Sequence, residues 1–241
     1  MKIQLFIMTF LLLLSPSFAQ TYSVVKGSVY GVSSKYDVIE RANSKMNAGI
    51  FEKGTKLHLT EDWGICTIKD KGRAHMFFSN KMHVWIGGKT TLWIDNFEQF
   101  VDKDENGKVI PDDGGFVGNF RVNGDVDFKL TKLSDSGYFN ISTNGASLDV
   151  KSKRFYVSTF NNLTTIECYD GEITMTDSET LKDTILKAGE SANVYGKDGR
   201  MNSSIIITPL TESAKEKANG RITEEEVVPD WNLLSSSPKT P

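Results

Sequence analysis

Apolar and polar side chains alternate with a period of two through most of this chain, and turn residues interrupt the alternation about every 8 to 12 residues. The apolar runs are short and rich in Val, Ile, Thr, Tyr, Phe and Trp, which favour β-strands. This pattern predicts an all-β fold, a single jelly-roll-like β-sandwich. A coiled β-solenoid is the alternative, because it also gives short strands with regular turns. The runs lie at 22–33, 55–70, 75–97, 124–133, 137–160, 163–177 and 183–196.

Five dipeptides predict tight reversals between these strands. Each places Gly, Asn or Asp, which tolerate a positive φ, where a hairpin with a two-residue loop requires it. We therefore expect a hairpin at each of them. They are Gly87-Gly88, Asn106-Gly107, Asn123-Gly124, Asn144-Gly145 and Asp170-Gly171.

The N-terminus has a different pattern. Met1-Lys2 precedes an apolar run over 3–14, and small residues follow up to Ala19. These features are typical of a secretory signal peptide over 1–19, so the product is expected to be exported, either periplasmic or secreted. The apolar run is shorter than the roughly 20 residues that span a bilayer, and no later stretch comes close. No transmembrane segment is therefore expected in the mature chain.

One short helix is predicted after the last strand pattern. Thr211 is placed as its N-cap, Glu212 lies in its first turn and Gly220 follows its C-terminus. The sequence thus predicts a signal peptide over 1–19, a β domain over 20–210, and a short helix with a partly disordered tail over 211–241.

The tail itself changes character along its length. It is charged at first, and from about Ser235 it is rich in Ser and Pro, which is typical of disordered segments. Between these parts lie Trp231, Leu233 and Leu234, which are able to dock the tail on the domain.

The charge balance argues against nucleic acid as a partner. The signal peptide contains only Lys2 among the charged residues, so the mature chain has 27 Lys and Arg against 31 Asp and Glu, and the net charge changes from -3 to -4. The chain is mildly acidic and has no basic patch with interleaved aromatic residues.

Two cysteines, Cys66 and Cys168, lie in strand-like segments, and each shares its face with an apolar neighbour, Ile68 or Ile166. In an oxidising compartment an even number of cysteines is consistent with a disulfide, which would stabilise the fold by a few kcal/mol. The alternative is two buried free thiols. The sequence leaves both open, because it does not show whether the Cα atoms lie within the roughly 7 Å that a bridge needs.

Five segments between Tyr22 and about Gly196 give the chain a characteristic order of strands and turn glycines. They are "GIFEKGTKLHL", "GGKTTLWIDNFEQF", "GDVDFKLTKLSDSGYFNISTNGASLDVKSKRFYVST", "TTIECYDGEITM" and "LKAGESANVYG". This order resembles the exported β domain of FecR-like proteins. One departure is Lys151-Ser152-Lys153-Arg154 before Phe155, where the family has an Arg-Gly-Thr-like turn. Without that Gly a positive φ is less accessible, so an identical turn is not expected.

The resemblance implies a non-enzymatic domain that acts as a sensing or protein-contact module in the bacterial envelope. Its expected partner is therefore an envelope protein. The family provides no catalytic residues to transfer and no cofactor.

Residues 102–113 resemble a calcium-binding loop for half of their length. The last candidate ligand, Asp113, is shorter than the Glu that closes an EF-hand, and the following residues do not form an exit helix. The alternative is an acidic hairpin tip in solvent, and the sequence leaves both open. The candidate calcium ligands are Asp102, Asp104, Asn106, the carbonyl oxygen of Lys108 and Asp113.

The histidines do not indicate an enzyme. His58, His75 and His83 lie in strands or turns and form neither a metal-binding nor a Ser/His/Asp signature, and they are expected at the surface.

The aromatic residues suggest another class of function, a carbohydrate-binding module whose partner is a surface glycan. Trp85 and Trp93 flank Gly87-Gly88 and are expected near each other across a hairpin. Core packing is the alternative for most of the aromatic residues, because each buries a large apolar area. The chain thus has a second candidate function, as a calcium-stabilised or carbohydrate-binding module.

Overall fold

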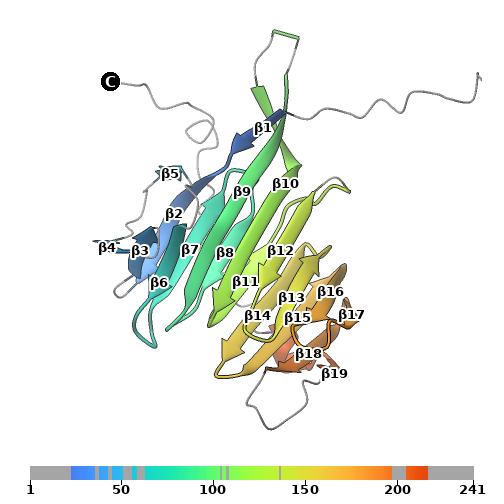
Figure 1. The fold of residues 1–241 in the computed structure, drawn as a ribbon. Coiled ribbons are helices and arrows are strands. Elements are labelled where there is room, and N and C mark those ends of the chain that lie inside the picture. Colours follow the sequence, from blue (N-terminus) through green and yellow to red (C-terminus); the bar gives the residue numbers. More distant parts are fainter. Residues whose placement is uncertain are drawn as a thin grey trace, which may run out of the picture.

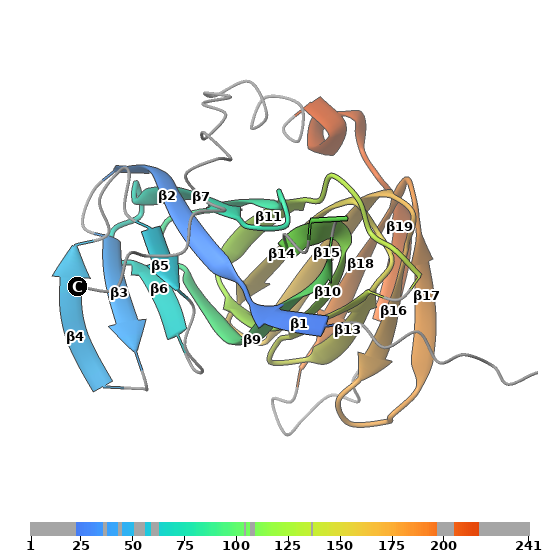
Figure 2. The same cartoon turned by 90° about the horizontal axis from the view of Figure 1, so that it is seen from above.

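The described residues form two β-sheets packed face to face and one short helix (Figures 1 and 2). Among them there is neither a closed barrel nor a solenoid, so the predicted β-sandwich is confirmed and the solenoid alternative is wrong. The structure is a computed structural model that describes residues 23–35, 38–42, 45–50, 56–58, 63–103, 105–106, 109–135, 137–196 and 205–216.

Both sheets run along the whole sandwich in nearly the order of the sequence. Sheet A has the order β17 (Asp183–Lys187), β16 (Glu172–Asp177), β13 (Ala146–Val150), β12 (Tyr138–Ser142), β10 (Val109–Asn123), β9 (Thr91–Lys103), β6 (Trp63–Thr67), β3 (Val38–Ala42) and β4 (Lys45–Ile50), and β1 (Ser23–Lys26) also pairs with β9. Sheet B has the order β19 (Ile205–Pro209), β18 (Glu190–Tyr195), β15 (Leu163–Asp170), β14 (Arg154–Phe160), β11 (Asp125–Lys129), β8 (His83–Ile86), β7 (Arg73–Phe78), β2 (Ser28–Lys35) and β5 (Lys56–His58).

The chain advances along the sandwich by adding strands to one sheet and then to the other. The hairpin β7–β8 lies in sheet B, β9–β10 in sheet A, β14–β15 in sheet B and β16–β17 in sheet A. Between β10 and β12 the chain adds one strand, β11, to sheet B instead of a hairpin. Because β11 lies in sheet B, β12 returns to sheet A alongside β10 in a parallel pair.

Two of the predicted turn dipeptides lie in hairpins. Asn144-Gly145 connects the antiparallel strands β12 and β13, and Asn106 lies in the turn between the antiparallel strands β9 and β10.

The hairpins predicted at the other three dipeptides are wrong. Gly87-Gly88, Asn123-Gly124 and Asp170-Gly171 each carry the chain from one sheet to the other. At Gly124 φ is +112°, and a Cβ there would lie 2.6 Å from the Cα of Thr90. The local signal for a bend was correct, but a positive φ does not specify whether the next strand pairs with the previous one or crosses to the opposite sheet.

A cluster of seven phenylalanines fills the space between the sheets. Neighbouring rings have centroid distances between 4.8 and 6.3 Å, which is the range of favourable aromatic pairs. The rings come from both sheets, and the cluster therefore ties the sheets together at the middle of the sandwich. Its members are Phe78, Phe97, Phe116, Phe120, Phe128, Phe139 and Phe155.

The helix begins where the sequence predicts. It spans residues 212–216, and the Thr211 hydroxyl oxygen accepts a hydrogen bond from the backbone N–H of Ala214 at 3.2 Å, as expected of an N-cap. Gly220 lies outside the described residues. No helix within the described ranges has the length and apolar character needed to cross a membrane.

Substitution of Phe139 by Ala tests the phenylalanine cluster. Phe139 is fully buried, so its truncation should lower the free energy of unfolding by about 3–5 kcal/mol, measured by urea denaturation. Phe160 is 74% exposed and is the matched control, because its truncation removes the same atoms from solvent. Similar losses for both variants would contradict this description of the core.

Candidate functional site

Two rows of side chains cross the outer face of sheet B, the face turned away from sheet A. The register places the residues of each row directly opposite one another on neighbouring strands. Row one comprises His75, Trp85, Asp127, Tyr156 and Glu167. Row two comprises Phe77, His83, Lys129, Arg154 and Asp170.

Alternation along β7 explains how these residues reach the outer face. Ala74, Met76 and Phe78 point into the core between the sheets. His75 and Phe77 therefore point outward, yet they are only 4% and 1% exposed. An outward-pointing residue of a sandwich is ordinarily in contact with water on one side. This face is therefore covered over these two residues.

Aromatic and cationic groups stack within the rows. The rings of His75 and Trp85 lie 4.5 Å apart at an interplanar angle of 12°. The guanidinium of Arg154 lies 5.4 Å from the Trp85 ring and 5.9 Å from the Tyr169 ring, at distances typical of cation–π contacts. Arg154 also donates from Nη2 to Asp127 Oδ2 at 3.1 Å, and the Asp127 side chain is 2% exposed.

Both imidazoles on this face are held in the neutral form. Burial lowers the pKa of His75 from 6.5 to about 4. Burial, followed by repulsion between the protonated imidazoles of His83 and His75 and by the positive charges of Lys129 and Arg154, lowers the pKa of His83 from 6.5 to about 3. The rows thus combine flat aromatic rings with ionised side chains of both signs.

Three ring nitrogens on this face are buried without a hydrogen-bond partner. They are Nε2 of His75, Nδ1 of His83 and Nε1 of Trp85. Buried polar atoms of this kind ordinarily find a partner. The arrangement suits an extended segment that offers acidic groups, backbone carbonyl oxygens and apolar side chains.

The predicted calcium ligands are distributed along the β9–β10 hairpin. Asp102 lies in β9 opposite Ile110, and Asn106 lies in the turn. Asp113 lies in β10, further from the turn than the pair Val101–Pro111. Asp104 and Lys108 lie outside the described residues. No group of three His, Cys, Asp or Glu residues suited to a metal ion occurs among the described residues, and the calcium site stays a prediction.

Both cysteines are free in the structure. Cys168 is fully buried in β15 of sheet B, as its neighbour Ile166 predicts. Cys66 lies in β6 of sheet A and is only half-buried, because Ile65 and not Cys66 points into the core, and its neighbour Ile68 is 47% exposed. The two cysteines therefore lie in different sheets and face in different directions.

The expected pairing of Trp85 and Trp93 is wrong. Gly87-Gly88 crosses between the sheets, so Trp85 lies on the outer face of sheet B and Trp93 on that of sheet A. Gly64 leaves room for the Trp93 ring, since a Cβ there would lie 2.5 Å from Trp93 Cε3. A sugar-binding face could also draw on six other aromatic residues near these strands, and they divide between core and surface: Phe97, Phe139 and Phe155 are buried, and Phe100, Tyr138 and Tyr156 are at least partly exposed.

The histidine rows were not predicted. His83 points away from the core as expected, but His75 is buried instead of exposed. The ring centroids of His75 and His83 lie 5.6 Å apart. The short separation of His75 and His83 in the sequence, on two strands joined by a short turn, was a sign that the two rings lie close together. The register of the β7–β8 hairpin was needed to show that they lie in adjacent rows. The side chain of His58 lies outside the described part of β5.

A second surface lies at the end of the sandwich where β17 and β19 close the two sheets (Figure 2). Within the described residues each of these strands pairs on one side only, with β16 and β18. Each carries a large exposed apolar side chain, Ile185 at 51% and Ile206 at 48%. We call these two strand edges the open end.

Two solved structures are similar to this chain. Both are described as a "putative anti-sigma factor from Parabacteroides distasonis ATCC 8503", with 13% and 14% sequence identity and a TM-score of 0.44 in each case. They cover 61% and 63% of this chain, which spans 59% and 60% of theirs. No family model and no curated protein matches this chain.

The buried histidines predict a stability that depends on pH. Between pH 6.5 and about 4 the unfolded chain binds a proton at His75 that the folded chain does not bind, so the free energy of unfolding should fall as the pH falls through this window. The loss from His75 is on the order of 3 kcal/mol at pH 4. Urea denaturation of wild type and His75→Gln between pH 7 and 4.5 measures it, because carboxylates titrate equally in both. Parallel curves would contradict the buried neutral imidazole.

The calcium prediction has a separate test. If Asp102 and its neighbours hold calcium, the melting temperature should fall in chelator relative to millimolar Ca²⁺, because a ligand that binds only the folded state stabilises it by mass action. Asp102→Ala should remove this difference, and Asp135→Ala, which lies in another loop, should retain it. An unchanged melting temperature in wild type would support the plain hairpin tip.

Proposed function

We propose that this chain is an exported, non-enzymatic FecR-like β module that binds a protein of the bacterial envelope through its open end. The observation that carries this proposal is the pair of strand edges at β17 and β19. An edge strand exposes unpaired backbone N–H and C=O groups to another chain, and natural proteins ordinarily limit this with charges, bulges or prolines. β17 and β19 have five residues each and carry charges or proline only at their ends, at Asp183, Lys187 and Pro209. Here they carry exposed Ile185 and Ile206.

Strand addition is the mode of binding that these edges support. An extended segment of a partner would continue the hydrogen-bond ladder of β17 or β19, and the exposed isoleucines would contact alternate side chains of that segment. Leu181 enlarges the apolar area next to β17, because it is 76% exposed in the turn that precedes this strand. The open end thus offers backbone groups for affinity and side chains for specificity.

The resemblance to FecR-like domains supports the same class of function from the sequence. It implies a sensing or contact role, and the signal peptide predicted over 1–19 supports an envelope location. The assignment of a role without chemistry rests on this resemblance and on the open end together.

Charge placed on the edges tests this function. A photoreactive phenylalanine analogue at Thr208, which is exposed on β19, should give a discrete adduct with one envelope protein in the native cell. Ile185→Lys and Ile206→Lys should lower the adduct yield by about tenfold or more, because a partner strand cannot pack on a charged edge. Folding should be retained, since both positions are exposed.

Phe160→Lys is the matched control, because it places the same charge at a highly exposed apolar position in a hairpin instead of an edge. An adduct that is insensitive to the edge variants would overturn the open end as the contact surface. Hydrolysis of a model glycoside or ester that a single substitution abolishes would overturn the non-enzymatic role.

A further inference from the structure

Part of the two rows on the outer face of sheet B is buried within a single chain, and most of the other row residues are half-buried. Phe77 is 1% exposed, His75 4% and Asp127 2%. The described strands form only two sheets, and none of them lies above this face as a third layer. Lys129, Arg154 and Tyr169 also take part in further interactions within the chain. The cover must therefore come from a segment of this same chain.

We propose that the C-terminal segment 223–234, "TEEEVVPDWNLL", docks across the two rows, with Trp231 over the aromatic side chains of Phe77 and Trp85. This inference goes beyond the proposed function and does not depend on it, because the open end and the two rows lie on different surfaces.

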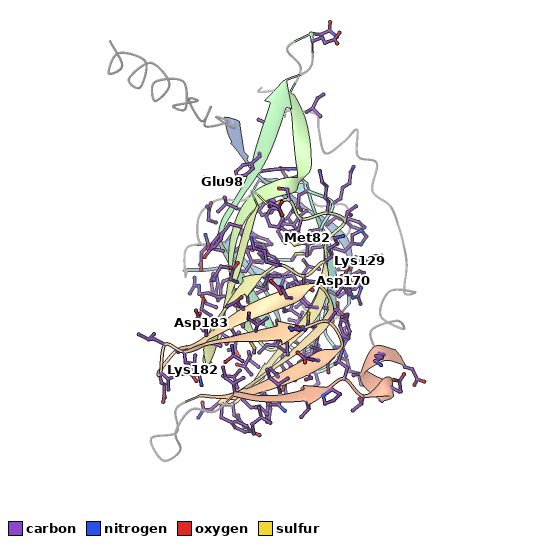
Figure 3. All side chains as sticks on the ribbon, turned by 90° about the vertical axis from the view of Figure 1, so that its right-hand side faces the viewer. Met82, Glu98, Lys129, Asp170, Lys182 and Asp183 are labelled. Carbon is purple, nitrogen blue, oxygen red and sulfur yellow. The ribbon has the colours of Figure 1, made fainter. Side chains whose placement is uncertain are left out.

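The path of the chain leads to this face. Pro209 at the end of β19 pairs with Glu190, which pairs with Cys168, and the same register line continues through β14 and β11 to Val84 in β8. The chain thus leaves sheet B level with the two rows. Figure 3 shows the helix on the side of the molecule that carries Lys129 and Asp170, opposite to Glu98 and Asp183.

The length of the segment is sufficient. Six strand spacings separate β19 from β7, which is about 29 Å at roughly 4.8 Å each. The 15 residues from 217 to 231 reach up to about 50 Å when extended. Trp231 can therefore reach Phe77 with slack for a curved path. A tethered segment also has a high effective concentration, so modest contacts are enough to hold it.

The acidic residues of the segment have basic counterparts on β11 and β14, while Asp127 pairs with Arg154, and Glu167 and Asp170 lie further along the rows on β15. Four acidic residues precede or adjoin Trp231, namely Glu224, Glu225, Glu226 and Asp230. Row two presents Lys129 and Arg154 side by side on paired strands, and the positive charges of both lower the pKa of His83. Lys81 stands in the β7–β8 turn at the end of row two, where Thr131 donates to its carbonyl oxygen. Carboxylates of the segment that lie beside Lys129 and Lys81 are stabilised by these positive charges.

The apolar and hydrogen-bonding groups match as well. Trp231, Leu233 and Leu234 bring apolar surface to a face that has Phe77 and Trp85 at its centre. Nε1 of Trp85 can only donate, and it lacks a partner on the face itself. Carboxylate and backbone carbonyl oxygens of the segment supply acceptors for it.

Site-specific labelling of the histidines tests the docking in the full mature chain. Diethylpyrocarbonate modifies accessible neutral imidazoles, and the modification of His75 and His83 is read by mass spectrometry at pH 7. Both should be protected in wild type. Trp231→Ala should raise their rates of modification by about tenfold or more, because loss of the anchoring side chain opens the face. Lys239→Ala, which lies beyond the segment, is the matched control and should leave both rates unchanged.

Alkylation of Cys168 separates docking from folding. This thiol is fully buried in the core, so it should stay unreactive in Trp231→Ala if only the segment is released. If that variant exposes Cys168, a triple variant with Glu224, Glu225 and Glu226 changed to Lys replaces it, and the histidines should become reactive while Cys168 stays protected. Histidines that stay protected in a folded variant would overturn the proposal. Protection that disappears on dilution of wild type would assign the cover to a second copy and would also overturn it.

Discussion

The packing of the phenylalanine cluster between the two sheets is the constraint on which the other features depend. Because seven large rings occupy the middle of the sandwich, every strand that contributes one must turn that face inward. Alternation then fixes the opposite side chains on the outer faces. Phe78 and Met76 point into the core, so Phe77 and His75 must point outward. Phe128 and Phe155 likewise place Lys129 and Arg154 on the outer face of sheet B. The two rows are therefore a direct consequence of the core.

The two surfaces of interest differ in their physical character. The outer face of sheet B is closed: its imidazoles are neutral, its ring nitrogens are buried and its arginine is held between Asp127 and two aromatic rings. The open end is accessible: its strands carry backbone groups and branched side chains at the limit of both sheets. A face that the chain covers by itself stabilises the fold and shields an aromatic patch from nonspecific association. A free edge with exposed isoleucines is suited to a partner. The two proposed contacts, one within the chain and one with a partner, would therefore use separate surfaces of the same sandwich.

Several elements could be predicted from the local sequence pattern. The predictions that were wrong, three hairpins and the pairing of Trp85 with Trp93, have one cause. The strands, the buried Ile166 and Cys168 and the Thr211 cap follow from alternation and capping chemistry, which act over a few residues. The dipeptide at Asn144-Gly145 also gave the predicted hairpin. Gly87-Gly88, Asn123-Gly124 and Asp170-Gly171 have the same local chemistry but cross between sheets. The choice between reversal and crossing depends on which strand is available for pairing, and that strand is distant in the sequence. The separation of Trp85 from Trp93 follows from this one choice.

The sequence by itself determined that the chain is built of short strands, which side chains on each strand share a face, and where the helix begins. These properties depend on φ, on side-chain alternation and on contacts between neighbours in the chain. Tertiary structure alone decided which strands join each sheet, and with this the register that sets His75 beside Trp85 and Lys129 beside Arg154. Burial of the phenylalanines favours this arrangement, because it encloses all seven rings between the two sheets. The surfaces of the molecule were settled at this second stage, since a side chain acquires its neighbours only when distant strands pair.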